Sequence, residues 1–213
     1  PVGTGNVALG DTALDSVQSS GTYNTAIGHI AGTNITTGIR NTIIGGFSGD
    51  DLTDADYNVT LGFGALGSDT KGNKSIAIGV DALTAQNFTS STDTNNVAVG
   101  YQAGASVTTG RHNNFFGAVA GDAITDGESN VAIGTASLGS DTRGNFSVAI
   151  GHAALNSQNT TNDTDMYNTA VGYHAGTAVT TGTANTLIGG LAGDAITDGS
   201  NNVVVGVSAL TTN

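Results

Sequence analysis

Two acidic segments of this 213-residue chain carry the residue types that most readily bind a hard metal ion. The sequence Asp-Ala-Ile-Thr-Asp-Gly occurs at 122–127 and again at 194–199. Calcium takes about six to eight oxygen ligands, which clustered carboxylates and turn carbonyls can supply. The calcium candidates are Asp122, Asp126, Asp194 and Asp198. Aspartate also suits turns, where its side chain accepts hydrogen bonds from nearby backbone N–H groups, and we favour that interpretation.

Aromatic residues in two insertions form a second kind of candidate, because an exposed ring can contact a sugar or a protein. The insertions lie within segments 85–95 and 157–167, and they contain Phe88 and Tyr167. Insertions in a solenoid form loops on one face, which is often the binding face. Phe88 and Tyr167 are therefore possible receptor contacts, although neutral loop padding is the interpretation that we favour.

The histidines show no arrangement typical of a catalyst. They lie far apart in the sequence, and no Gly-x-Ser-x-Gly nucleophile motif occurs. In the repeat register His29 exchanges with Tyr101 and Tyr173, which indicates a surface or interface ring and adds both tyrosines to the possible receptor contacts. We therefore predict no catalytic residue, no cofactor-binding residue and a protein that is not an enzyme. The four histidines are His29, His112, His152 and His174.

The composition excludes several classes of protein. The chain has 33 glycines, one proline, no cysteine and only 10% charged residues. The absence of cysteine excludes disulfides and thiolate metal sites, and no apolar run is long enough to span a membrane. A net charge of −12 would repel nucleic acid, so we expect neither a nucleic-acid partner nor membrane insertion. Position 1 is Pro rather than Met, so we expect a processed or excised piece.

The glycines mark a tandem repeat that fills the chain. The phrase Asn-x-small-(Ile/Val/Leu)-Gly recurs twelve times, and its units run mostly 17 residues with a longer unit of 21. A longer period of 72 residues joins four units, so that segment 24–95 aligns without gaps onto 96–167. The first unit is 6–23, and 168–213 is a third, partial copy. We therefore expect residues 1–213 to form one domain.

Each unit predicts one short strand that ends at its glycine. The residue before the glycine is always large and apolar, and the residue two places earlier is usually Val, Ile or Thr. Residues at i and i+2 of a strand share one face, so we expect the twelve large residues to stack as an interior column. The residue between them, mostly Ala, would then face outward and permit close packing with another copy. Asparagine four places before most of the glycines predicts a ladder of hydrogen bonds along the stack.

The fold class is therefore all-β, a parallel β-solenoid of about twelve coils of 17–21 residues. Asn-Val-Ala-Ile-Gly (130–134) and Ser-Val-Ala-Ile-Gly (147–151) resemble the head repeats of YadA-like trimeric autotransporter adhesins, which are similar to repeats of phage tail fibres. The resemblance covers the whole chain. It implies a left-handed β-roll, an intertwined or side-by-side homotrimer, and an adhesive or structural role at a cell surface, outside the cell or on a virion. The implied partners are other copies of the chain and a carbohydrate or protein receptor.

Two alternatives keep a solenoid but change its role. One is a filament subunit that stacks end to end, since open ends of a solenoid can pair with other copies. The other is a hexapeptide-type acyltransferase, which needs aliphatic residues at every sixth position. Starting from Ile44 those positions hold Asp50 and Asp56, so the hexapeptide pattern fails in most units.

Overall fold

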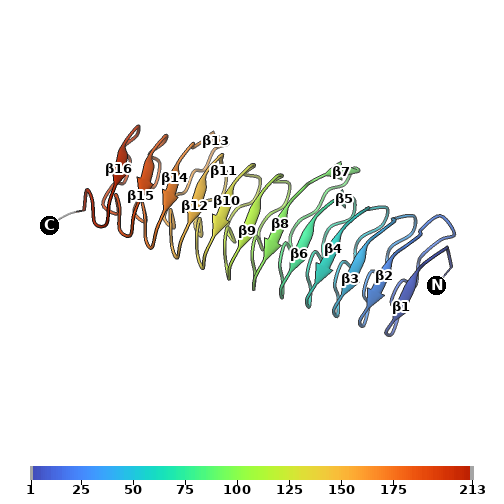
Figure 1. The fold of residues 1–213 in the computed structure, drawn as a ribbon. Coiled ribbons are helices and arrows are strands. Elements are labelled where there is room, and N and C mark those ends of the chain that lie inside the picture. The colour runs from blue at the N-terminus through green and yellow to red at the C-terminus, as the bar shows by residue number, and fades with distance from the viewer. Residues whose placement is uncertain (1, 212–213) are drawn as a thin grey trace.

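The computed structural model describes residues 2–211, which stack as one rod of parallel β-coils (Figure 1). Each coil contributes a three-residue strand to a 12-stranded sheet, in which every strand pairs in parallel with the strands of the neighbouring coils. The predicted β-solenoid of about twelve coils is confirmed. The strands of this long sheet are β1 (Val7–Leu9), β2 (Thr25–Ile27), β3 (Thr42–Ile44), β4 (Val59–Leu61), β6 (Ile76–Ile78), β8 (Val97–Val99), β9 (Asn114–Phe116), β10 (Val131–Ile133), β12 (Val148–Ile150), β14 (Thr169–Val171), β15 (Thr186–Ile188) and β16 (Val203–Val205).

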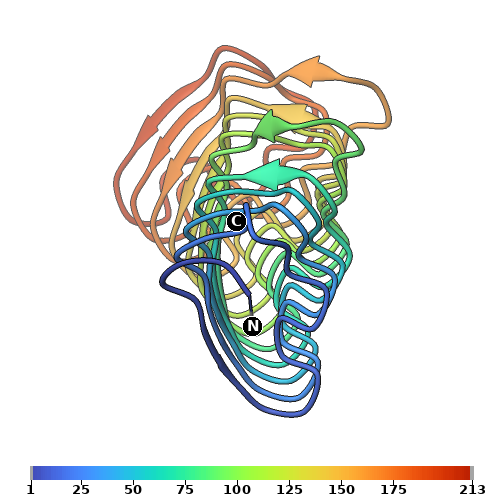
Figure 2. The same ribbon diagram turned by 90° about the vertical axis from the view of Figure 1, so that its right-hand side faces the viewer.

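Four further strands build two short arms, in each of which a strand of the inserted segment pairs with a strand of the preceding coil. In the first arm β5 (Gly72–Asn73) pairs with β7 (Thr92–Asp93), and in the second β11 (Gly144–Asn145) pairs with β13 (Thr164–Asp165). Viewed along the rod, both arms lie at the top, apart from the long sheet (Figure 2). Residues 2–211 contain no helix that is long and apolar enough to cross a membrane.

The face of each strand that points into the coil is the one that the sequence predicted to point outward. The central residue of each strand is the buried one, as at Ala26, Ala77 and Ala132, whereas the large residues on either side of it point outward. Leu61, for example, is 45% exposed. The prediction of an interior column of large residues is therefore wrong. The coil is narrow, so only a small residue fits at the inward position of most strands. Leucines and isoleucines of the segment that follows the strand fill the remaining space.

Side-chain volume inside the rod varies with the 72-residue period. Three strands carry a large central residue in place of alanine or threonine: Ile43, Phe115 and Leu187. Each of these packs against two glycines of the facing segment, and a Cβ atom added to Gly121 would lie 2.5 Å from the Phe115 ring. In other coils a buried leucine occupies the glycine position, as at Leu66, Leu83, Leu138 and Leu155. The interior thus keeps its density by pairing large residues with small ones.

The predicted asparagine ladder is confirmed, and most of its bonds are to the backbone. The Asn41 backbone N–H donates to Oδ1 of Asn24 at 3.0 Å, while Asn24 Nδ2 donates to the Gly38 carbonyl at 2.7 Å. Coil after coil repeats these two bonds. Serine replaces asparagine at Ser75 and Ser147, which lie in the coils that carry the arms. The ladder therefore fixes the register of neighbouring coils with buried, fully paired amides.

Candidate functional site

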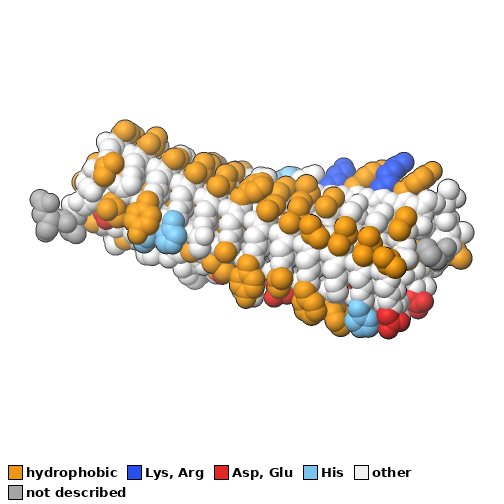
Figure 3. Space-filling model, turned by 60° about the horizontal axis from the view of Figure 1, so that its bottom comes forward, with side chains coloured by type: hydrophobic (Ala, Val, Ile, Leu, Met, Phe, Trp, Pro, Cys, Tyr) orange, Lys and Arg blue, Asp and Glu red, His pale blue; other side chains and the backbone are white. Residues whose placement is uncertain are grey.

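The long sheet exposes an apolar surface along the whole rod. We call it the outer face, and it consists of the first and third residues of every strand in the long sheet. The third residue is apolar in every strand, whereas the first is Val or Ile in seven strands and Thr or Asn in the other five. Its residues are half-buried or exposed, with Val59, Leu61 and Ile133 among the exposed ones. Hydrophobic side chains lie in rows along one side of the rod (Figure 3). Soluble monomers rarely expose contiguous apolar patches beyond a few hundred Å², so this row of large apolar side chains is a candidate interface.

Aromatic rings gather at several of the corners that follow the repeated glycines. Tyr101 and Tyr173, two of the predicted receptor contacts, are both exposed there. Tyr173 forms a cluster with His152 and His174, with its ring centroid 5.6 Å from that of His152 and 4.2 Å from that of His174, and the two histidine centroids are 5.3 Å apart. Near the other end of the rod the rings of His29, Phe47 and Phe63 form a similar cluster, with 5.5 Å between neighbouring centroids. The sequence reasoning missed Phe47 and Phe63, although their positions near a repeated glycine were visible.

A second exposed column lies directly before the asparagine ladder. Its residues have left-handed backbone angles, including a φ of 57° at Arg40 and 51° at Tyr167. The guanidinium of Arg40 lies 5.9 Å from the ring centre of Tyr23 and 5.4 Å from that of Tyr57. Tyr167, a predicted contact, is exposed and stacks on Phe146 with ring centroids 5.4 Å apart. This column was not singled out from the sequence, although each member directly precedes a ladder residue.

The expectation of an exposed ring at Phe88 is wrong. Phe88 is only 8% exposed, its backbone N–H donates to Asp69 Oδ1 at 3.0 Å, and its carbonyl accepts from the Thr70 hydroxyl at 2.8 Å. These bonds tie the start of the first arm to the coil beneath it. An apolar ring at this position is buried rather than presented to a receptor.

The calcium candidates do not meet in one cluster. Among residues 2–211 no three His, Cys, Asp or Glu side chains are placed to hold a metal ion. Asp126 pairs with Arg143 at 3.0 Å, and Asp198 accepts from the Thr197 hydroxyl at 3.3 Å. Burial raises the pKa of the Asp122 carboxyl. Asp194, its equivalent one block later, has a buried Oδ1 without a hydrogen-bond partner in the described part of the chain.

Buried polar networks anchor both arms from inside. Gln86 Nε2 donates to Asp69 Oδ2 at 2.5 Å and to Ser75 Oγ at 2.9 Å, and Gln86 Oε1 accepts from Asn96 at 2.8 Å. Burial raises the pKa of Asp69, against the opposing effect of its hydrogen bonds from Phe88, Gln86 and the backbone. The network is enclosed and satisfied, so it stabilises the coil and offers no surface to a substrate.

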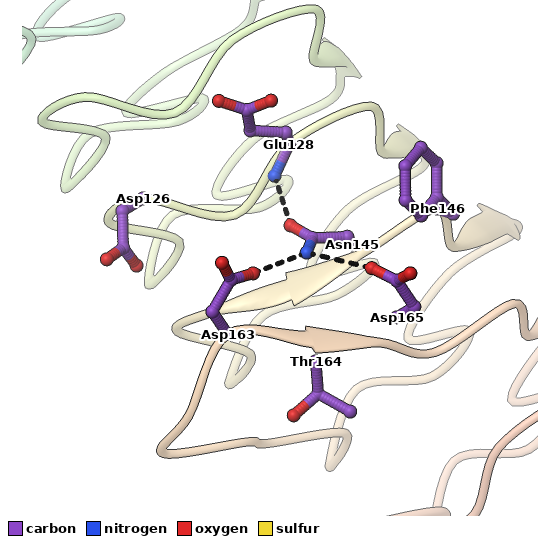
Figure 4. Close-up of a pocket in the computed structure, with 7 residues that line it drawn as sticks. All are labelled: Asp126, Glu128, Asn145, Phe146, Asp163, Thr164 and Asp165. Atoms are coloured by element: carbon purple, nitrogen blue, oxygen red, sulfur yellow. Dashed lines mark hydrogen bonds between the residues drawn. The ribbon is translucent and has the colours of Figure 1, made fainter.

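An open hollow of about 670 Å³ lies beside the second arm (Figure 4). Asn145, on β11, donates through Nδ2 to Asp163 at 2.5 Å and to Asp165 at 3.3 Å. Its Oδ1 accepts from the Glu128 backbone N–H at 2.8 Å, and the Phe146 ring borders the hollow near Asp165. Asp165 also accepts from the Tyr167 hydroxyl, which raises the pKa of that phenol. The residues that line the hollow are Asp126, Glu128, Asn145, Phe146, Asp163, Thr164 and Asp165.

The residue arrangement thus offers an outer face with a row of large apolar side chains, exposed aromatic rings at several corners, and an acidic hollow beside the second arm. Searches of protein-family models, of curated proteins and of solved structures found no match to this chain.

Proposed function

We propose that this chain is a non-enzymatic structural and adhesive module of a surface fibre, which assembles as a homotrimer through the outer face. The observation that carries the proposal is the row of large apolar side chains at the third strand position, which runs through all twelve strands on the outward side of the long sheet. The assembled rods would present their corners and arms to a carbohydrate or protein receptor, at a cell surface, outside the cell or on a virion.

Self-association is supported by the distribution of apolar groups. The coil interior already holds the small strand residues, so the large ones on the outer face gain burial only against another molecule. Strands of different copies can pack these rows face to face, as sheets do in a sandwich. The subunit number of three and the left-handed coil come from the resemblance to YadA-like head repeats.

Light scattering coupled to size-exclusion chromatography tests the assembly. We expect the purified chain to elute at three times its mass, and the double variant Ile133→Asp with Ile150→Asp to elute as a monomer, because paired like charges would be buried at the interface. Thr89→Asp with Thr161→Asp adds the same charge on exposed arm positions and should leave the trimer intact. A monomeric wild-type chain would contradict the proposal, whereas growth beyond three with concentration would favour the end-to-end filament.

The attachment role has its own test. Binding of the assembled rod to a panel of immobilised glycans and matrix proteins should be saturable for at least one member. Binding to none of them at micromolar protein would contradict an adhesive role and leave a purely structural one.

A further inference from the structure

The two arms start from equivalent places in the 72-residue blocks, but their surroundings differ in chemistry. Lys74 beside the first arm corresponds to Phe146 beside the second, and Ser91 corresponds to Asp163. Asp93 and its equivalent Asp165 are present in both. The second block therefore has the aromatic ring of Phe146 in place of the Lys74 ammonium group, and it has the additional carboxylate of Asp163.

The first block supplies its own ammonium group. Lys74 Nζ donates to Asp93 Oδ2 at 2.5 Å, and this ion pair lowers the pKa of the Asp93 carboxyl. Asn73 Nδ2 donates to the Ser91 hydroxyl at 3.0 Å. An ammonium next to this carboxylate is thus compatible with the arm, because the chain itself places one there.

The second block has the carboxylates without the ammonium. The nearby cations are committed elsewhere, Arg111 to Glu128 at 2.9 Å and Arg143 to Asp126 at 3.0 Å. Within residues 2–211, Asp163 and Asp165 have no ion-pair partner, and both accept from the shared Asn145 amide. Asp165 Oδ2 also accepts from the neutral Tyr167 hydroxyl at 3.1 Å. Two carboxylates that share one neutral amide donor favour the binding of a positively charged group.

The space beside these carboxylates is larger than an ammonium group needs. The hollow of about 670 Å³ falls within the usual range for sites that bind small organic molecules. Phe146 is 43% exposed, stacks on Tyr167 on one side, and has the small Ser129 as the preceding member of its column. One side of its ring is therefore open to a ligand, and a flat ring face suits the C–H face of a sugar.

We propose that this hollow binds an amino sugar with a free primary amine, whose ammonium lies against Asp165 and Asp163 where the first block holds Lys74. The sugar ring lies against Phe146, and its hydroxyl groups donate to the remaining carboxylate oxygens of the hollow. A lysine side chain would satisfy the carboxylate pair but would leave those other acceptors and the ring face unused. The inference rests on the proposed attachment role and gives it a ligand class.

Isothermal titration of the full chain with the disaccharide of glucosamine tests the site. We expect saturable binding with one ligand per chain, and a shift of the Asn145 side-chain amide in parallel NMR spectra. The N-acetylated disaccharide should bind at least about tenfold more weakly, because it lacks the charge that the carboxylates select. Equal affinity for the two disaccharides would overturn the proposal, as would equal affinity for a capped lysine.

Exchanges between the blocks provide the sharper variants. Phe146→Lys gives the second block the built-in ammonium of the first and should weaken binding about tenfold or more. Thr37→Lys adds the same charge at an exposed turn of the first block, outside the hollow, and should leave binding unchanged. Lys74→Phe with Ser91→Asp should raise the stoichiometry from one ligand to two.

Unchanged affinity in Phe146→Lys would overturn the site. Light scattering on the same samples reports the assembly independently, because all residues of the hollow lie in one chain. A rod that binds other immobilised glycans but not the glucosamine disaccharide would overturn this inference and leave the attachment role standing.

Discussion

The two full blocks of the rod, 24–95 and 96–167, are alike inside and different outside. Inside, the bonds of Gln86 to Asp69 and Ser75 recur at the same 2.5 and 2.9 Å in the bonds of Gln158 to Asp141 and Ser147. Outside, the same arms are flanked by an ion pair in one block and by an aromatic ring with an acidic hollow in the other.

The difference shows which positions the stack constrains. An interior residue contacts the coil before it and the coil after it, so a change in its size or hydrogen bonding must be matched by two neighbours. A side chain at the arm contacts solvent on one side and has no such requirement. A duplicated solenoid can therefore acquire a new surface chemistry while its scaffold stays the same.

The main interior difference is the size of the large strand residue, which is Ile43 in the first block and Phe115 in the second. We expect Gly121→Ala to lower the free energy of unfolding by about 3 kcal/mol, because its Cβ would lie 2.5 Å from the Phe115 ring. Gly49→Ala should cost only about 1–2 kcal/mol, since its nearest contact is the flexible Leu52 Cδ1 at 2.9 Å. The φ angles of 58° and 50° are alike, so the backbone cost largely cancels between the two variants.

Urea unfolding midpoints measure this pair. Gly190→Ala is the control, because the only neighbour within reach of its Cβ is the Tyr173 carbonyl oxygen at 3.9 Å. Adding Phe115→Ile to Gly121→Ala should recover part of the loss. Equal costs for Gly121→Ala and Gly49→Ala would show that side-chain volume inside the two blocks is not matched to the glycines.

Much of the scaffold could be predicted from the sequence, because stacked coils carry the same residue type at equivalent positions. The strand positions, the parallel register and the asparagine ladder all follow from that repetition. The inward face could not be predicted, because alanine and the large residues beside it are both apolar and alternate on opposite faces. The choice depends on the width of the coil, which is set by buried residues of the facing segment such as Leu66 and Leu138.

The candidate sites were less accessible from the sequence. Phe88 and Tyr167 lie at different places in the two insertions, and the ring near the start is buried whereas the ring at the end is exposed. Such a difference depends on the path of the arm, which residue types alone do not fix. The hollow at Asn145 had a usable signal, since the alignment of the two blocks places Phe146 against Lys74.

The pH dependence of stability should distinguish the interior from the arms. Burial raises the pKa of the carboxyls of Asp50, Asp69 and Asp122, so the folded chain binds these protons more tightly than the unfolded chain. Stability from these groups is therefore full below the unfolded pKa near 3.8 and falls as the pH rises through the folded values. We expect urea midpoints to increase as the pH is lowered from 7 towards 4.

Asp69→Asn provides the control for this pH effect. The variant should have a shallower slope, while Asp50 and Asp122 keep the remainder. It should also lower stability by about 1–3 kcal/mol at neutral pH, because the asparagine amide would face the Gln86 amide donor. A midpoint that falls steadily on acidification from pH 7 would contradict the expected direction.

The smallest effect is expected at the ion pair of the first arm. Lys74→Ala should leave the urea midpoint nearly unchanged, because both side chains are exposed and solvent screens their attraction. It should nevertheless raise the lowered pKa of Asp93 towards its ordinary value, which carbonyl-detected NMR titration measures directly. Stability from this group is present above the unfolded pKa and lost as the pH falls through the folded one, opposite in sign to Asp69. An unchanged Asp93 pKa in Lys74→Ala would show that the ammonium does not hold this carboxylate in solution, and the contrast between the two arms would then lie in Phe146 and Asp163 alone.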